Sequence, residues 1–308
     1  MHGISVIVPA RDEGAGLLAM VRGLLAGRRG RLPVEVVVVD DASSDGSGDA
    51  VRAWAGRQRG VRIEVVRLAA WRGIPFARNR GAERARLRWL LHTDANAELA
   101  VGWDVEVARA MSVHAFACGV VRDLASPFVG YGCRPVLPSL GVHWITAPDA
   151  YGGCVPVASC AATAIASEMF FGLGGYDESL PFYGAAEVEF SWRAWLSGGH
   201  IALAPGWVVG HRFRTANERG RRLGPIEAIV RLNYLRLAAY YLPPPLLACT
   251  LEHYARQAPA TRRAFDAELD RGDLWRRRDA LRRRLRHPFE DYACRFGLVP
   301  SNSRGALQ

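Results

Sequence analysis

Short apolar runs alternate with segments of helical periodicity over the first third of the chain. The runs are rich in valine, isoleucine and leucine, which is typical of strands buried on both faces. The pattern predicts strands at Ile4–Pro9, Val34–Val39, Val61–Leu68 and Arg88–His92, and helices at Leu17–Leu25, Ser47–Gln58 and Phe76–Arg86. This alternation predicts an α/β fold with a mostly parallel, doubly wound sheet.

Polar residues lie at the carboxyl ends of three of these predicted strands. The segments that contain them are Pro9–Glu13, Asp40–Asp41 and Asp94–Asn96. Right-handed crossovers bring the carboxyl ends of parallel strands to one edge of a sheet, so we expect the three segments to converge. Open α/β sheets bind their ligands at that edge.

The residue types at this edge suit a nucleotide diphosphate. Asp40 or Asp41 can accept a hydrogen bond from a base N–H or a ribose hydroxyl, and Asp94 with Asn96 can hold a divalent cation. Guanidinium groups that fit phosphate oxygens are supplied by Arg72, Arg78 and Arg80. Two alternatives stay open: an Asx-turn after the fourth strand, and a solvated helix face for the arginines.

The second half of the pattern is less regular. It predicts helices at Gly102–Ser112 and Glu187–Leu196, and strands at Ala115–Val121, Val157–Ser167 and Ile201–Pro205. The intervening segment 122–156 is rich in glycine, proline and aromatic residues. It is either a binding loop or a loop stapled by its own aromatic side chains. His211 follows the last strand and is either a structural histidine or a further metal ligand.

The composition narrows the function classes. The chain has 308 residues, 50% of them hydrophobic, and a net charge of +10 from 40 basic and 30 acidic residues. Every basic residue is arginine, which excludes lysine chemistry and a P-loop lysine and is typical of a GC-rich bacterial genome. Without a GxGxxG after the first strand, a Rossmann dehydrogenase is disfavoured. The basic balance favours phosphate-bearing partners, although we expect no nucleic acid.

The expected localisation is cytoplasmic. The six cysteines show no CxxC spacing, which disfavours a zinc ribbon or a thioredoxin-type site. We recognise no N-terminal signal segment, and no stretch reaches the ~18 uninterrupted apolar residues of a membrane span. A peripheral position at the inner face of the membrane is the alternative.

The last segment predicts a helical appendage rich in arginine. Residues 256–295 hold twelve arginines, and an apolar stripe at helical spacing is formed by Leu274, Trp275, Leu281 and Leu285. The favoured interpretation is a terminal helix packed on the main domain. The alternative is an amphipathic helix that touches an anionic membrane surface or an acidic peptide. The predicted domains are 1–225, 226–300 for this extension and 301–308 for a disordered tail.

These residues resemble the motifs of nucleotide-sugar glycosyltransferases with the GT-A fold. Family-2 enzymes typically open with segments similar to Ser5–Pro9 and Val38–Asp45. A closer likeness is to the catalytic domain of polypeptide N-acetylgalactosaminyltransferases, over Arg72–Ala82, Asp94–Glu98, Gly174–Asp177, Tyr183–Trp195, Gly198–Gly199, Val209–Arg214 and Leu232–Arg236. The resemblance covers roughly residues 4–242 and implies a GT-A fold with a C-terminal helical appendage.

Carried over position by position, the resemblance implies a UDP-sugar site. The residues implied for Mn²⁺, or Mg²⁺, are Asp94, Asn96 and His211. The residues implied for the uridine are Pro9, Glu13 and Asp40 or Asp41, and the residue implied near the diphosphate is Arg78. Asn96 takes the place of a histidine or aspartate, so weaker metal binding is expected.

A second departure concerns the catalytic groups. Family-2 enzymes place an acidic pair where this chain has Ala186 and Glu187, so only the second carboxylate is present. Glu187 is then the candidate catalytic residue, as a base that deprotonates the acceptor. The closer likeness implies retention at the anomeric carbon, whereas Glu187 as a base would permit inversion.

The resulting prediction is a metal-dependent hexosyltransferase or N-acetylhexosaminyltransferase. It moves a sugar from a UDP-sugar to an acceptor hydroxyl or thiol, and the likeness suggests a peptide or protein acceptor. One alternative is an inverting family-2-like enzyme that acts on a cell-surface glycan or a small-molecule natural product. Another is a catalytically impaired nucleotide-sugar-binding module, motivated by Asn96 and Ala186.

Overall fold

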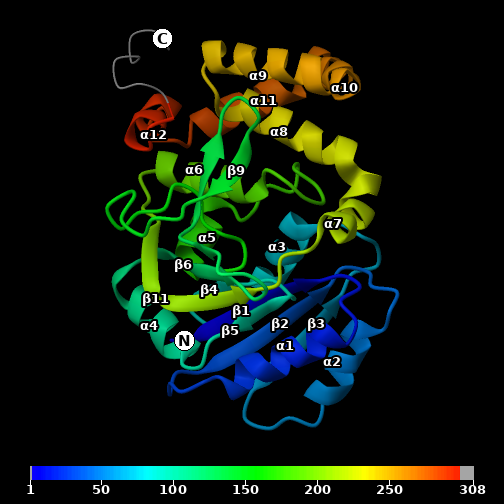
Figure 1. Cartoon of the computed structure of the whole chain (residues 1–308), viewed down its shortest axis with the longest axis vertical. Helices are drawn as coiled ribbons and strands as arrows, with labels where there is room; N and C mark the ends of the chain where they lie inside the picture. Colours follow the sequence, from blue (N-terminus) through cyan, green and yellow to red (C-terminus); the bar gives the residue numbers. More distant parts are fainter. Residues whose placement is uncertain (1, 299–308) are drawn as a thin grey trace.

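The computed structural model describes residues 2–298 and has a nine-stranded mixed sheet at its centre (Figure 1). The strand order is β3-β2-β1-β4-β10-β6-β11-β5, with β7 paired to β6. The strands that pair in parallel at one end are β1 (Ile4–Ala10), β2 (Val34–Asp40), β3 (Arg62–Arg67) and β4 (Trp89–His92). The four strands predicted in the first third of the chain are therefore confirmed.

Helices cover both faces of this parallel half. One face packs against α1 (Ala15–Ala26) and α2 (Ser47–Ala55), and the other against α3 (Ile74–Arg84), whereas α4 (Trp103–Val113) packs on the second half of the sheet, at β6, β10 and β11. Every residue of β1 and β2 is buried, which explains why both strands are mostly apolar. Among the polar exceptions, Ser5 and Glu35 bond to each other at 2.6 Å. The predicted doubly wound α/β class is confirmed.

The second half of the sheet is mixed. It contains the parallel pair β6 (Phe116–Asp123) and β11 (Ala202–His211), and the antiparallel strands β5 (Ala97–Leu99), β7 (Val129–Gly130) and β10 (Thr163–Ala166). The strand predicted at Val157–Ser167 is too long, because a turn from Ser159 to Ala162 precedes β10. β5 was not predicted, since three residues are too few to show a period.

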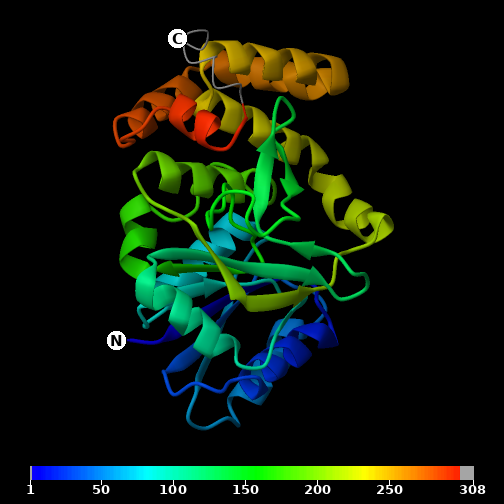
Figure 2. The ribbon, with the colours of Figure 1, turned by 60° about the vertical axis from the view of Figure 1, so that its left-hand side comes forward.

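The aromatic segment 122–156 is more ordered than its composition predicts. It contains a hairpin of β8 (Cys133–Val136) and β9 (Gly141–Trp144), which pair with each other. The hydroxyl of Tyr254, on α9, donates to the Ser139 carbonyl at 2.9 Å. The hairpin therefore reaches from the sheet to the C-terminal helices (Figure 2).

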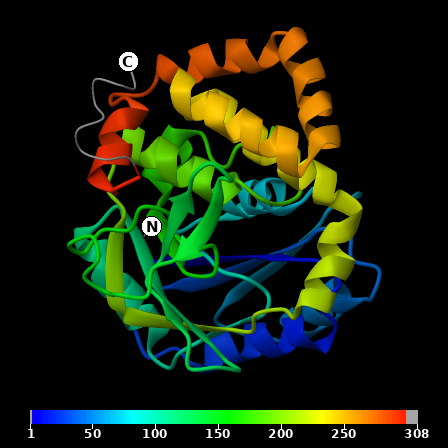
Figure 3. The same cartoon turned by 45° about the horizontal axis from the view of Figure 1, so that its top comes forward.

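The C-terminal helices form a layer over α5 (Ser167–Leu173) and α6 (Ala186–Leu196), away from α1 and α2 (Figures 2 and 3). They are α8 (Glu227–Tyr241), α9 (Pro244–Gln257), α10 (Pro259–Asp270), α11 (Asp273–Arg282) and α12 (Phe289–Arg295). Before them come α7 (Ala216–Leu223), which lies beside the loop that precedes α1, and a 3₁₀ turn at Gly224–Ile226. In residues 2–298, no helix is long and apolar enough to cross a bilayer.

The predicted apolar stripe of the tail needs one correction. Leu274 and Leu281 are buried in the main core, and Leu285 packs against it, whereas Trp275 is 39% exposed. Trp275 follows Leu274 by one residue and is therefore turned by about 100° around the helix. The predicted tail 301–308 lies outside the described residues, and the predicted domain boundaries stay a prediction.

Candidate active site

A buried arginine joins two carboxylates at the carboxyl edge of the sheet. Arg78, on α3, donates to Glu187 Oε1 and to Asp94 Oδ1, both at 3.0 Å, and to the Cys160 carbonyl at 3.2 Å. Burial opposes its charge, but Tyr176 and the two carboxylates raise the pKa of Arg78 well above its ordinary value. The guanidinium is therefore a permanent positive charge that holds two acidic side chains in place.

Asp94 lies just beyond β4, and its second oxygen faces a histidine and a thiol. Oδ2 is 3.5 Å from His211 Nε2 and accepts a hydrogen bond from Cys160 Sγ at 3.4 Å. Burial raises the pKa of Asp94, but the hydrogen bond with His211 and the charge of Arg78 lower it to about 2. Both oxygens thus face groups from distant segments, which is not the geometry of an Asx-turn. The turn after β4 is closed by the backbone, since the Ala97 N–H donates to the Asp94 carbonyl at 3.1 Å.

The short strand β5 explains why the β4 exit meets the end of β11. Ala97 pairs with His211, and the Arg212 N–H donates to the Asn96 carbonyl at 3.2 Å. Asn96 Nδ2 returns a hydrogen bond to the Arg212 carbonyl at 2.8 Å. The pairing fixes Asp94 and His211 on one small surface, although more than a hundred residues separate them.

An aromatic cluster surrounds the histidine. The His211 ring lies 4.6 Å from the ring of Phe213, which packs edge-on against Phe128 and Trp144 at 5.7 and 5.8 Å. The imidazole Nδ1 is buried and has no hydrogen-bond partner in the described chain. Phe128 and Trp144 therefore pack against each other and against Phe213, as expected for a loop that its own aromatic side chains hold in place.

The pair Asp94 and His211 fits a divalent cation that also binds a diphosphate. Two ligand atoms of one octahedral ion lie about 3 Å apart, close to the 3.5 Å between Asp94 Oδ2 and His211 Nε2. Because the Asn96 amide nitrogen is bonded to backbone, its oxygen is the atom suited to a cation. Residues 2–298 contain no group of three His, Cys, Asp or Glu side chains that could hold a metal by themselves. Phosphate oxygens would have to complete the coordination shell.

The two aspartates after β2 bind the protein's own loops. Asp41 accepts from the backbone N–H groups of Arg72 and Gly73 at 2.8 and 2.7 Å, and burial raises its pKa. Asp40 accepts from the Ser43 N–H and from Arg67, both at 2.8 Å. The aspartates therefore shape the loops at this edge, and their contact with a nucleotide stays a prediction.

Glu13 connects the first loop to the segment after His211. Its carboxylate accepts from Arg214 at 2.8 and 2.9 Å and from Arg222 at 2.9 Å. Arg222 also donates to the Arg11 and Asp12 carbonyls, both at 2.9 Å. Glu13 thus lies at the carboxyl edge of the sheet, as the sequence predicts, but its carboxylate is bonded to two arginines. Nothing in the sequence signals Arg222 as its partner.

The remaining predicted residues lie close to this edge. Pro9 is buried in β1, opposite Val39. Glu187 is the second residue of α6, after the buried Ala186, and its side chain is 23% exposed. All three predicted phosphate-binding arginines contact other protein groups: Arg78 bonds to the two carboxylates, and Arg72 and Arg80 stack over Phe76 at 4.1 and 4.8 Å. Their contact with a phosphate stays a prediction.

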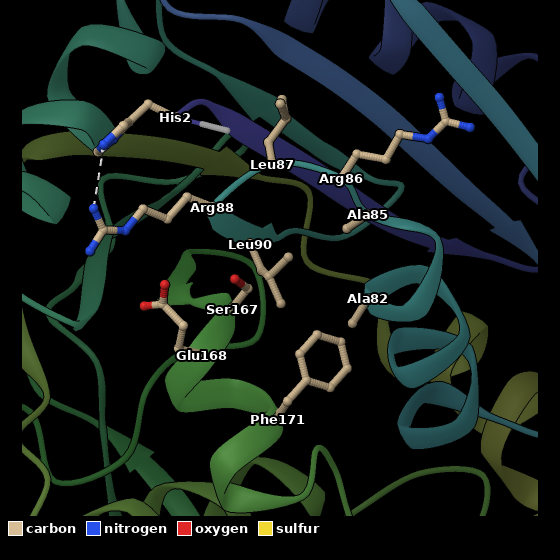
Figure 4. A pocket seen from close by; sticks show the side chains of 10 residues that line it. All are labelled: His2, Ala82, Ala85, Arg86, Leu87, Arg88, Leu90, Ser167, Glu168 and Phe171. Atoms are coloured by element: carbon tan, nitrogen blue, oxygen red, sulfur yellow. Dashed lines mark hydrogen bonds between the residues drawn. The ribbon is translucent and has the colours of Figure 1, made fainter.

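A cavity of about 410 Å³ lies away from these residues, at the opposite edge of the sheet (Figure 4). It borders the start of β4 and of α5, whereas Asp94 follows the end of β4. Its floor contains Leu90 and Ala82, and the side chain of Arg86 points away from it. The cavity is therefore separate from the candidate site.

Comparison with known proteins relates the chain to glycosyltransferases. The family model "Glycosyl transferase family 2" matches residues 5–128. Polypeptide N-acetylgalactosaminyltransferase 3 of Homo sapiens is 28% identical over 262 residues, covering 77% of this chain and 41% of the relative. Polypeptide N-acetylgalactosaminyltransferase 8 of Drosophila melanogaster is 27% identical, covering 79% of this chain and 44% of the relative. The chain thus spans about two fifths of the length of these relatives.

Solved structures show the same fold. GalNAc-T7 with UDP, GalNAc and Mn²⁺ has a TM-score of 0.65 and 22% identity, covering 78% of this chain and 48% of that one. The mannosyltransferase PcManGT of Pyrobaculum calidifontis, with GDP-Man and Mn²⁺, has a TM-score of 0.56 and 19% identity, covering 96% and 86%. The predicted GT-A fold and the likeness to polypeptide N-acetylgalactosaminyltransferases are therefore confirmed.

Proposed function

From this GT-A glycosyltransferase relationship, we propose that the chain uses a divalent metal, Mn²⁺ or Mg²⁺, to transfer a sugar from a UDP-sugar to an acceptor hydroxyl or thiol. The observation that supports it most is Arg78, which fixes Asp94 and Glu187 on either side of one guanidinium while His211 faces the other oxygen of Asp94. UDP and Mn²⁺ in the GalNAc-T7 structure support the donor and metal classes.

Each residue has a distinct role in this proposal. Asp94 and His211 would hold the metal, and the amide oxygen of Asn96 is the third ligand proposed. The metal, when bound, supplies positive charge that stabilises the leaving diphosphate. Arg78 keeps Asp94 ionised and oriented, since its charge contributes to the low pKa of that carboxyl.

Glu187 is the group proposed to accept the acceptor's proton. Its Oε1 bonds to Arg78, and its side chain remains partly accessible at the start of α6. Negative charge is favoured at the first turn of a helix. A base at this position suits direct displacement with inversion, so the inverting alternative keeps a physical basis. The acceptor is proposed as a peptide or protein from the names of the relatives, with a glycan or small natural product as the alternative.

Donor turnover tests this proposal. The wild type and Asp94→Ala are incubated with a panel of UDP-sugars and Mn²⁺, and release of UDP is measured with and without candidate peptides. Arg80→Ala, on the same helix but directed to Glu178, is the matched control. We expect the wild type and the control to release UDP and Asp94→Ala to release none. Binding of UDP without release from any donor would favour the impaired binding module instead.

The cytoplasmic localisation and the bacterial origin stay predictions. A peripheral contact with an anionic membrane surface is also a proposal, and the arginine-rich C-terminal helices would make it.

A further inference from the structure

A second concentration of positive charge lies in the C-terminal helices. Residues 276–286 contain seven arginines, but the structure uses four of them internally, including Arg284, which donates to the Gly172 carbonyl at 3.4 Å. Arg276 pairs with Asp273, and Arg277 pairs with Asp177 at 2.7 Å. Arg278 is buried and donates to two carbonyls at the end of α8, at 2.6 and 2.9 Å. The charge left for a partner is therefore concentrated near the end of α11.

Two of the remaining arginines border a cavity of about 350 Å³. The ends of α6 and α8 and the segment between α11 and α12 form its walls. The apolar and aromatic lining residues are Leu196, Tyr240, Tyr241, Leu285, Pro288 and Phe289, and the charged or titratable ones are Arg282, Arg286, His287 and Glu290. The hydroxyls of the two tyrosines are bonded to Ser179 and Glu189, so both tyrosines offer mainly ring surface.

Backbone hydrogen bonds hold the charged rim of the cavity, which consists of Arg282, Arg286, His287 and Glu290. The N–H groups of Arg286 and His287 both donate to the Leu196 carbonyl, at 2.8 and 2.9 Å. A Cβ at Gly198 would lie 3.4 Å from Arg286 Cδ, so this side chain runs along the end of α6. The rim therefore has a fixed position relative to the aromatic wall.

The positive charge of this rim is only partly balanced. Among residues 2–298, neither Arg282 nor Arg286 has a carboxylate within ion-pair distance, and Glu290 is the carboxylate that lines the cavity. Together with burial, Arg282 lowers the pKa of Arg278 to about 10. Unpaired guanidinium groups beside an apolar wall suit a ligand that carries an anion on an apolar body.

We propose that this cavity binds the phosphate headgroup of an anionic lipid. Arg282 and Arg286 would take the phosphate oxygens, and the aromatic wall would contact the first apolar part of the lipid. A lipid is favoured over free phosphate because six of the ten lining residues are apolar or aromatic. In addition, Trp275 is exposed on α11, and tryptophan beside a cluster of arginines is typical of membrane-surface helices.

Vesicle sedimentation with the full chain tests this site without any glycosyl transfer. The vesicles contain phosphatidylcholine alone or with about one quarter phosphatidylglycerol. The test variant is Arg282→Gln/Arg286→Gln. The control variant, Arg256→Gln/Arg263→Gln, removes the same charge from two exposed arginines on α9 and α10 that do not line the cavity. Far-ultraviolet circular dichroism verifies that both variants fold.

The wild type should bind the anionic vesicles and not the neutral ones. The test variant should bind roughly 30-fold more weakly, since each arginine at an anionic surface contributes about fivefold. The control should lose less than about threefold, and millimolar inorganic phosphate should compete weakly. Equal losses in both variants would show diffuse attraction instead of a site. Full competition by inorganic phosphate would show a free-phosphate site, and absence of binding to anionic vesicles would also overturn the proposal.

Discussion

Replacing Arg78 tests whether one buried guanidinium organises the candidate site. Arg78→Met removes three hydrogen bonds and the charge between Asp94 and Glu187, whose side chains are 18% and 23% exposed. Breaking a buried ion pair costs about 3–5 kcal/mol. Because both carboxylates keep some contact with water, we expect a loss of about 3 kcal/mol in the free energy of unfolding.

Arg78→Lys separates charge from geometry. A lysine keeps the positive charge, but its single ammonium lacks the fork that reaches Asp94 and Glu187 together. Loss of one charge-assisted hydrogen bond costs about 1.5–3 kcal/mol, so the lysine variant should lie between the wild type and Arg78→Met. The order of the three proteins is thus the signature of a positioning role.

Urea unfolding and calorimetric binding of UDP with Mn²⁺ measure the two consequences. Arg80→Met is the matched control, because Arg80 is on the same helix and pairs with exposed or half-exposed carboxylates. Its loss should stay below about 1 kcal/mol. We expect Arg78→Met to unfold at lower urea and to lose Mn²⁺-dependent UDP binding. If Arg78→Met unfolds and binds as the Arg80 control does, the proposed organisation of the site is wrong.

Three further predictions concern Asp94, the aromatic cluster and Glu13. Because the pKa of Asp94 is lowered from 3.8 to about 2, its ionised form stabilises the fold above about pH 4, and this contribution of about 2 kcal/mol is lost as the pH falls toward 2. The stability difference between the wild type and Asp94→Asn should therefore shrink over that range in urea titrations, and a constant difference would contradict the assignment. Trp144→Ala should lower Mn²⁺ affinity about tenfold without removing a ligand, because Phe213 and His211 lose their support; unchanged affinity by metal titration would refute this. Glu13→Gln should speed tryptic cleavage after Arg214 or Arg222, whereas Glu227→Gln, which weakens an exposed ion pair, should leave the cleavage rate unchanged. Equal rates in both variants would disprove the link through Glu13.

The strands of the first half were predictable because they are long and buried on both faces. Their runs of valine and isoleucine leave few alternatives, and right-handed crossovers then set the edge where Asp94 lies. β5 and β10 have three and four residues and owe their existence to neighbouring strands. A local pattern cannot reveal such pairings, and β5 is the strand that joins Asn96 to the end of β11.

The sequence indicated which residues gather at the candidate site better than it indicated which groups they contact. Asp94 and His211 lie close together, but the sequence did not indicate that Arg78 would bond to two carboxylates, and its contact with a diphosphate stays a prediction. Arg78 lies in a helix with other arginines, and only burial distinguishes it from Arg80. Cys160 was missed for a similar reason, since it falls in a run of small residues that resembles a strand.

The dependence of UDP binding on Mn²⁺ shows whether Asp94 belongs to a metal site. Calorimetry compares the wild type with Asp94→Asn, each in Mn²⁺ and in a chelator. We expect Mn²⁺ to tighten UDP binding to the wild type at least about tenfold and Asp94→Asn to lose this gain. Equal affinity for UDP in Mn²⁺ and in the chelator, or an unchanged gain in Asp94→Asn, would contradict the proposed metal site.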